Sequence, residues 1–163
     1  MSIEMVRAYS RNSFGAEERI LEFDVSSATV ELAASAVGCE PARIAKTLSF
    51  MVEGGPVLIV AAGDAKVDNH KYKEQFKTKA KMLSPDEVTD LVGHSVGGVC
   101  PFGVKEGVRV YLDESLKRFD AVYPACGSAS SAVRLSIPEL EKGLRLFGVD
   151  RCVQSLADGS DGQ

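Results

Sequence analysis

Two apolar segments joined by a short turn constrain the fold of this chain more than any other feature. Residues 46–52 and 56–62 are rich in the apolar side chains typical of strands, and Glu53, Gly54 and Gly55 between them form a turn sequence. We therefore expect an antiparallel hairpin. Further short strand candidates are residues 20–23, 108–112, 121–123, 132–135 and 149–153.

Helix start signals lie between these strands. Thr29 is a capping residue for a helix over residues 30–37. A helix-capping pattern, in which a serine is followed three residues later by a glutamate and a proline lies between them, starts at Ser84 and again at Ser136. The strands outnumber the helices, are short and do not alternate regularly with them. This organisation predicts an α+β fold, with a curved mixed β-sheet or partial barrel surrounded by helices.

Length and composition favour a single domain. With 163 residues and 45% hydrophobic side chains, the chain can bury a core without disulfide or metal cross-links. We expect that domain over residues 1–155 and a disordered tail over 156–163, which has little to bury. The longest apolar run, residues 56–62, is far shorter than the roughly 20 residues of a membrane span. No signal peptide is visible, so we expect a cytoplasmic protein.

Cysteines and histidines show no spacing typical of a metal site. The four cysteines, at positions 39, 100, 126 and 152, form no CxxC pair, and there are only two histidines. We therefore expect no metal, no cofactor and no disulfide framework. A cysteine nucleophile, Cys100 or Cys126 with His94 as its base, stays open as an alternative, because such pairs meet only in the folded chain.

Lys46 begins the first strand of the hairpin, on the same face as Leu48 and Phe50. A lysine on this more apolar face has two interpretations. Its side chain can extend past the edge of the sheet into water. Alternatively, a partly desolvated ammonium can line a pocket, where it donates hydrogen bonds to an oxyanion or orients a water molecule.

Two segments rich in small residues are candidates for a binding site. Residues 93–103 contain four glycines, which allow backbone amides to approach a ligand oxygen closely. Residues 124–131 combine small side chains with hydroxyls, which either cap backbone groups or line a small pocket. For the first segment, a compact structural turn is the alternative. Neither segment matches a P-loop or a dinucleotide-binding pattern.

Positive charge is concentrated in one stretch. Residues 66–81 contain six lysines against Asp68 and Glu74, a local balance of +4, while the whole chain carries −4. Tyr72 and Phe76 lie four residues apart within it, so one interpretation is an amphipathic helix whose aromatic side docks in the core. The other is a landing site for a polyanion, with contacts from Lys71, Lys73 and Lys77.

Three short motifs, in this order and spacing, resemble those of the YbaK/EbsC family, which is related to the editing domain inserted in bacterial prolyl-tRNA synthetases. They are residues 45–48 (Ala-Lys-Thr-Leu), residues 96–103 (Val-Gly-Gly-Val-Cys-Pro-Phe-Gly) and the pair Gly127 and Ser128. The resemblance extends over residues 20–153. It implies a mixed α+β structure around a curved sheet. It also implies hydrolysis of misacylated tRNA in trans, with mischarged tRNA-Pro or a related tRNA as substrate.

The resemblance also implies site residues. Lys46 matches the family's conserved lysine, and the loop from Gly97 to Pro101 matches its GxxxP motif. In the family these elements position the terminal adenosine and the carbonyl of the substrate and help to orient the attacking water, with neither a metal nor a covalent intermediate. The expected catalytic residues are Lys46, Gly97, Gly98, Val99 and Pro101. The expected substrate-binding residues are Thr29, His94, Gly127, Ser128 and Ser130.

Departures from the family pattern bear on the amino acid that is removed. Thr29 stands where some members that remove cysteine have an aromatic residue, and Val133 lies near the position of an aspartate in those members. A polar Thr29 with Ser128 and Ser130 suits a small or hydroxylated amino acid. The expected partners are aminoacyl-tRNA and, in addition, an aminoacyl-tRNA synthetase. The alternative is a non-catalytic tRNA-binding or regulatory module of the same fold.

Overall fold

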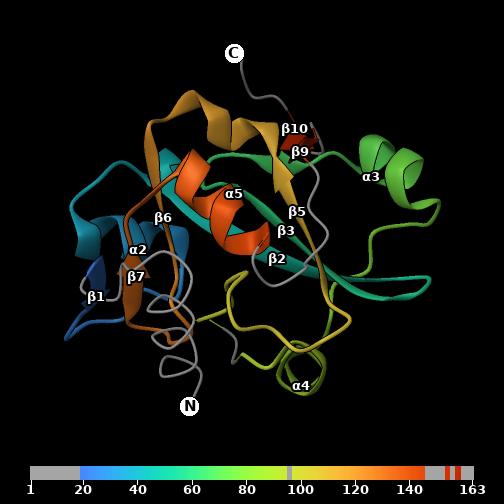
Figure 1. Ribbon diagram of the computed structural model, residues 1–163, viewed down its shortest axis with the longest axis horizontal. Coiled ribbons are helices and arrows are strands. Elements are labelled where there is room, and N and C mark those ends of the chain that lie inside the picture. Colours follow the sequence, from blue (N-terminus) through green and yellow to red (C-terminus); the bar gives the residue numbers. More distant parts are fainter. Residues whose placement is uncertain (1–18, 95–96, 146–152, 155–156, 159–163) are drawn as a thin grey trace.

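A six-stranded mixed sheet forms the centre of the protein (Figure 1). The computed structural model describes residues 19–94, 97–145, 153–154 and 157–158. Along the sheet the strands are β8 (Leu135–Ser136), β6 (Ala121–Pro124), β2 (Ile44–Val52), β3 (Gly55–Ala62), β5 (Arg109–Asp113) and β9 (Val153–Gln154). The α+β class and the curved mixed sheet are confirmed.

The expected hairpin is confirmed as β2 and β3, which pair antiparallel from Ala45 opposite Ala62 to Val52 opposite Gly55. Gly55 has φ +128°, a conformation in which glycine avoids the strain of a side chain. Two small sheets complete the strands. They pair β1 (Ile20–Glu22) with β7 (Ser131–Val133) and β4 (Lys66–Val67) with β10 (Ala157–Asp158).

Two expectations about strands need correction. Residues 132–135 do not form one strand, because the chain changes partner near Arg134: β7 pairs with β1, while β8 pairs with β6. Ala157 and Asp158 pair with β4, so the tail expected to be disordered contains a two-residue strand. Of the strand expected over 149–153, only its last residue falls within the described part of the chain, as the start of β9.

The helices begin where the sequence places their caps. Thr29 Oγ1 accepts a hydrogen bond from Leu32 N, and Ser84 and Glu87 form a reciprocal capping box. The helical segments are α2 (Val30–Val37), η2 (Pro41–Arg43), α3 (Asn69–Phe76), α4 (Pro85–Glu87), the π-helical turn η3 (Val88–Val92), η4 (Glu114–Arg118) and α5 (Ile137–Arg145).

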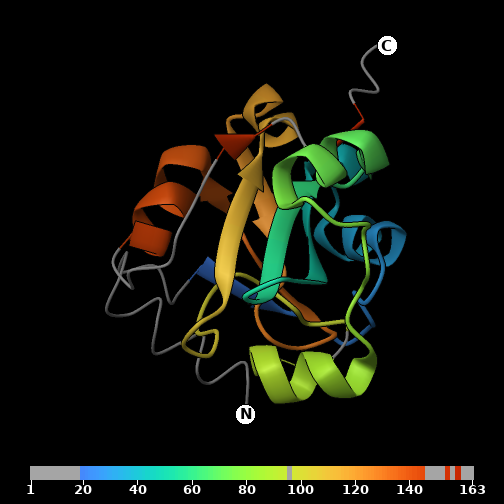
Figure 2. The same ribbon diagram turned by 90° about the vertical axis from the view of Figure 1, so that its right-hand side faces the viewer.

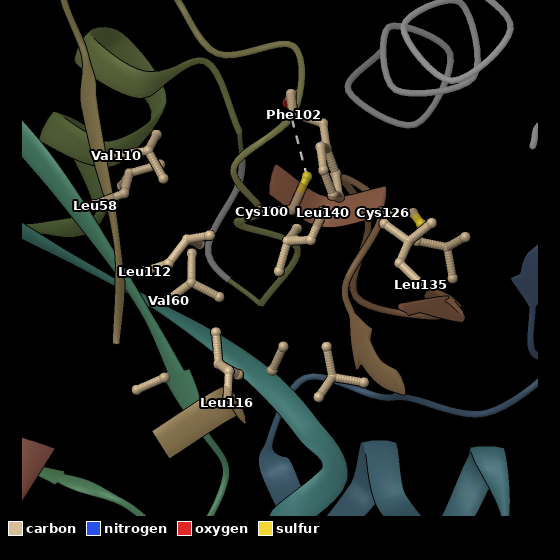
Figure 3. Packing of buried hydrophobic residues seen from close by; sticks show 14 of the residues in the cluster. Leu58, Val60, Cys100, Phe102, Val110, Leu112, Leu116, Cys126, Leu135 and Leu140 are labelled. Carbon is tan, nitrogen blue, oxygen red and sulfur yellow. Dashed lines mark hydrogen bonds between the residues drawn. The ribbon is translucent and has the colours of Figure 1, made fainter. Parts of the chain in front are cut away.

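Helices cover both faces of the sheet. Figure 2 shows α5 on one side of the sheet and α2 and α3 on the other. The larger core lies on the α5 side and is mostly aliphatic, with Leu58, Val60 and Leu140 fully buried (Figure 3). On the other side, Tyr72 of α3 packs against Phe50, with 5.1 Å between ring centroids. Alternate residues of β2 therefore face two different cores.

Candidate active site

A cavity of about 410 Å³ lies at the outer edge of β2. On that edge β2 pairs with β6 only at residues 44–45, and Phe50 forms an isolated bridge with Met82. Between these two contacts, residues 46–48 have no strand partner on that side among the described residues. The cavity occupies this gap. Its walls come from residues in five segments, 27–33, 44–49, 82–88, 97–99 and 123–132.

The lining of the cavity combines apolar side chains with hydroxyls. The apolar part includes alanines of α2, β2 and β7 together with larger side chains such as Ile44, Leu48 and Met82, and the hydroxyls are those of Ser27, Thr29, Thr47, Ser49, Tyr123 and Ser131. The Oγ1 atom of Thr47 is buried and has no hydrogen-bond partner in the described part of the structure. Such a surface accepts a small ligand group that offers hydrogen bonds, because buried hydroxyls gain from a partner.

Lys46 lines this cavity and is half-buried. Its Nζ atom donates hydrogen bonds to the carbonyl oxygens of Ala65 and Gly63, the latter at 3.4 Å. Since an ammonium has three donor hydrogens, one remains for a ligand. Burial lowers the pKa of Lys46 from its ordinary value, and the charges of Asp64 and Glu31 oppose this shift. The side chain therefore lies against the protein, as the pocket interpretation requires, and does not extend past the sheet into water.

The glycine-rich loop packs directly against the segment before β7. Gly127 N donates to Gly98 O at 3.0 Å, and a Cβ atom on Gly98 would lie 2.5 Å from Ser128 N. Gly97, with φ +93°, sits between the Cβ atoms of Ala28 and Ala129. Only glycine allows this close approach. Of the expected catalytic loop residues, Gly97 and Val99 line the cavity, whereas Gly98 and Pro101 are buried and are not part of the lining.

The expected substrate-binding residues divide into two groups. Thr29 lines the cavity while it caps α2. Gly127, Ser128 and Ser130 are not in the lining. Ser128 Oγ donates to Ser131 Oγ at 2.9 Å and accepts from Ser130 N at 3.3 Å, so these residues shape the turn that presents Ser131. Of the two interpretations of residues 124–131, these bonds therefore fit the one in which the hydroxyls cap backbone groups.

Sequence reasoning missed Ser27, Ser49, Thr47 and Ser131 as lining residues. For Thr47 and Ser49 a signal was present, because the period of two places both on the polar face of β2, opposite Lys46. Ser131 is the last residue of the segment 124–131, which the sequence marked as a candidate pocket wall, whereas no comparable local pattern marks Ser27. These two residues reach the cavity through the pairing of β1 with β7 and the adjacent bond from Ser27 N to Ala129 O.

The structure does not bring His94 to the cavity, in contrast to the expectation. His94 is fully buried in the larger core, with its Nε2 atom 2.7 Å from Phe102 O and 3.6 Å from Cys100 Sγ. Burial lowers the pKa of His94 and raises the pKa of Cys100 to about 12. A neutral thiol without solvent access is no nucleophile. Cys126 is equally buried in the same core (Figure 3), so the structure gives the cysteine mechanism no support.

The lysine-rich stretch forms β4, α3 and the segment that follows. Asp68 caps α3 by accepting hydrogen bonds from the amides of His70 and Lys71. Tyr72 and Phe76 pack into the second core, as the amphipathic interpretation predicts. In α3 itself Lys73 is exposed and Lys71 half-buried, and the other exposed lysines of the stretch, in β4 and after the helix, are Lys66, Lys77, Lys79 and Lys81.

Neither a metal cluster nor a membrane helix is found in the described part of the chain. No group of three or more His, Cys, Asp or Glu side chains is placed to hold a metal ion. None of the described helices is long and apolar enough to cross a membrane.

The model of the aminoacyl-tRNA editing domain matches residues 24–142. That match includes every residue that lines the cavity. The chain belongs to the aminoacyl-tRNA editing domain family. An uncharacterized protein of Bacillus subtilis, YwhH, is 53% identical to this editing domain over 87% of the chain and 90% of its own length.

Relatives of the editing domain also occur within larger enzymes. The proline–tRNA ligase of Geobacillus sp. strain WCH70 is 30% identical over 61% of this chain, a segment that makes up only 18% of the ligase. Among solved structures, a protein proposed to be a trans-editing enzyme for prolyl tRNA synthetase is 28% identical. It superimposes with a TM-score of 0.81 over 97% of this chain and 98% of its own. These likenesses confirm the family predicted from the three motifs and extend over the whole described fold.

Proposed function

We propose that this protein hydrolyses the ester bond of misacylated tRNA in trans. One observation carries the proposal: the half-buried side chain of Lys46 lines the same cavity as Gly97 and Val99 of the glycine-rich loop, inside the matched editing domain. The resemblance of the whole chain to a proposed trans-editing enzyme for prolyl tRNA synthetase supports action on a tRNA that was charged elsewhere.

The chemistry follows from the groups that meet in the cavity. A water molecule adds to the ester carbonyl, and negative charge develops on the carbonyl oxygen. The free donor of Lys46 and backbone amides of the 97–99 segment stabilise that charge. When the intermediate collapses, the bond between the carbonyl carbon and the ribose oxygen breaks, the proton released by the attacking water passes to the ribose oxygen, and the free amino acid leaves. No residue of the protein forms a covalent bond in this sequence.

The substrate is an amino acid with a small or hydroxylated side chain, carried on tRNA-Pro or a related tRNA. Support for a hydroxylated side chain comes from the hydroxyls of Thr29 and Ser131 in the lining, which can form hydrogen bonds with a polar group of the amino acid. Support for tRNA-Pro comes from the relatives in proline–tRNA ligases. Small apolar differences give only about 1–3 kcal/mol of discrimination, which is why a separate editing step is needed.

The lysines of α3 and of its C-terminal cap supply the contacts to tRNA phosphates in this proposal, with Lys71, Lys73 and Lys77 as the principal ones. Helix α3 lies on the same side of the sheet as α2, whose first residues line the cavity (Figure 2). The protein acts in the cytoplasm, where tRNA is charged, next to the synthetase whose errors it removes. Each lysine that neutralises a phosphate contributes about one unit to the slope of log affinity against log salt.

A panel of mischarged tRNAs tests the proposal. Alanyl-, seryl- and cysteinyl-tRNA-Pro are incubated with the wild-type protein and with Lys46→Ala, and ester hydrolysis is followed over time. We expect at least one substrate to be hydrolysed and the variant to be slower by roughly 100- to 1000-fold, the effect of removing one charge-stabilising donor. Lys105→Ala is the matched control, because Lys105 donates to the carbonyl of Asp90 at an exposed site away from the cavity. If no ester on the panel is hydrolysed, the proposal is wrong.

The second candidate is a tRNA-binding module without hydrolytic activity, which the exposed lysines in and around α3 favour, among them Lys73 and Lys77. In that case tRNA binds in a salt-dependent manner while the ester half-life stays that of the free substrate. The same panel, combined with a binding measurement at two salt concentrations, separates the two functions.

A further inference from the structure

The loop that follows β3 holds the ammonium of Lys46. Both carbonyl oxygens that accept hydrogen bonds from Lys46 Nζ belong to this loop, those of Gly63 and Ala65. The residue between them is Asp64, whose charge acts on Lys46. The position of the ammonium therefore depends on what fixes this loop.

Residues of η4 fix the loop at two points. Ser115 Oγ accepts a hydrogen bond from Ala62 N at 3.0 Å, immediately before the loop. Arg118 then binds Asp64 with both ends of its guanidinium, at 3.1 Å to Oδ2 and 2.5 Å to Oδ1. A planar guanidinium that binds both carboxylate oxygens restricts the angle as well as the distance.

Arg118 is itself restrained. Its Nε atom donates to Ser115 O at 3.0 Å, and its guanidinium lies 5.0 Å from the ring centroid of Phe119. Arg43 lies at a similar distance, 4.9 Å, from the same ring. On the opposite side of the loop, Gly63 has no room for a Cβ atom, which would lie 2.1 Å from Pro41 O. The loop is thus enclosed between η4 and η2.

Three charged side chains act on Lys46. Asp64 in the loop and Glu31 of α2 favour the charged ammonium, whereas Lys66 of β4 opposes it. Arg118 binds the carboxylate of Asp64 and lowers its pKa, so Asp64 stays ionised but is occupied. Without Arg118, the Asp64 carboxylate becomes available to the Lys46 ammonium, and a carboxylate is a stronger acceptor for an ammonium than a backbone carbonyl.

We propose that Arg118 and Asp64 are a positioning pair for Lys46. By occupying the Asp64 carboxylate, Arg118 keeps Lys46 on the two backbone carbonyls, with one donor directed to a ligand, and prevents a direct Lys46–Asp64 ion pair. The effect on catalysis rests on the function proposed above. The effect on the position and charge of Lys46 does not.

Four variants test the pair: Arg118→Ala, Asp64→Asn, the double variant of both, and Arg19→Ala. Arg19→Ala is the control, because Arg19 also contacts both carboxylate oxygens of its partner, Glu139, through its Nη1 atom and at a similarly accessible surface site. Exposed ion pairs of this kind contribute little to stability, so all four variants should fold. The readouts are the single-turnover deacylation rate and the pKa of Lys46, measured by NMR on ¹³C-labelled lysine and assigned with Lys46→Arg.

We expect Arg118→Ala to raise the pKa of Lys46 and to slow deacylation by roughly 10- to 100-fold, the size expected when a catalytic group moves by about 1 Å. Asp64→Asn lowers the pKa of Lys46. The double variant recovers most of the lost rate, because the competing carboxylate is gone. Arg19→Ala changes neither readout.

Two results would overturn the proposal: a Lys46 pKa that does not move in Arg118→Ala, or a double variant as slow as Arg118→Ala. The second result would mean that Arg118 only supports the fold. If the wild-type protein hydrolyses no misacylated tRNA, the proposed function fails, and the pKa measurement alone then decides on the positioning pair.

Discussion

Gly98→Ala tests whether the close packing of two loops shapes the cavity. The added Cβ atom would lie 2.5 Å from Ser128 N, 2.6 Å from Ser128 Cα and 2.7 Å from Gly127 C. All three atoms belong to the backbone, so no side chain can turn aside. Ordinary contact begins near 3.4 Å, so the loops must separate by about 0.9 Å, which also breaks the 3.0 Å bond from Gly127 N to Gly98 O.

The expected effect of Gly98→Ala has two parts. Overpacking costs about 1–3 kcal/mol, and the lost hydrogen bond about 1 kcal/mol, so the free energy of unfolding should fall by about 2–4 kcal/mol. Because Gly97 and Val99 move with the loop, deacylation should slow by roughly 100-fold. Urea denaturation measures the first part, and single-turnover hydrolysis at a temperature where the variant is folded measures the second.

Gly107→Ala is the control for this substitution. Gly107 has φ +94° and no atom within 4 Å of a Cβ position, so alanine there adds only local backbone strain of about 1–2 kcal/mol. It lies away from the cavity and should leave the deacylation rate unchanged. An unfolding free energy for Gly98→Ala within 0.5 kcal/mol of the wild type, together with a normal rate, would refute the packing argument.

Three further predictions concern His94, the cysteines and Thr29. Burial lowers the pKa of His94 below 6.5, so as the pH falls the imidazole of His94 takes up its proton in the unfolded chain before it does so in the folded protein. The free energy of unfolding should therefore decline below about pH 6.5, and it should decline less in His94→Gln. At pH 8 iodoacetamide should modify the half-buried Cys39, seen by mass spectrometry, before the buried Cys100 and Cys126; equal rates would contradict the burial. Thr29→Ala should lower the melting temperature by removing about 1 kcal/mol of capping, whereas Thr29→Ser should not.

Local signals in the sequence predicted most of the elements correctly. The β2–β3 hairpin and the caps at Thr29, Ser84 and Ser136 are all present in the structure. Each of these features depends on hydrogen bonds between residues close in the sequence, so the responsible residues can be read directly. The change of strand partner near Arg134 was not predicted, because it depends on the pairing of β1 with β7, which are more than 100 residues apart in the sequence.

For the candidate site, likewise, the sequence predicted the features that depend on local patterns and missed those that depend on distant contacts. The period of two along β2 predicted that Leu48 and Phe50 share a face with Lys46, and the structure places Leu48 and Phe50 in the same core cluster. His94 was expected at the substrate, but the chain around it turns inward so that its ring bonds to Phe102 O beneath the loop. Nothing in a single glycine-rich segment indicates which of its side chains will face the core.

The sequence by itself determined the class of fold, the hairpin that carries Lys46 and the family, since strand period, helix caps and short motifs are local properties. Only the tertiary structure decided that the cavity lies at the unpaired edge of β2, that Gly98 packs against Ser128, and that the loop holding Lys46 is bound by Arg118. Those contacts join residues 30 or more positions apart. Which of them form depends on how the whole core packs, and that is not encoded in any one segment.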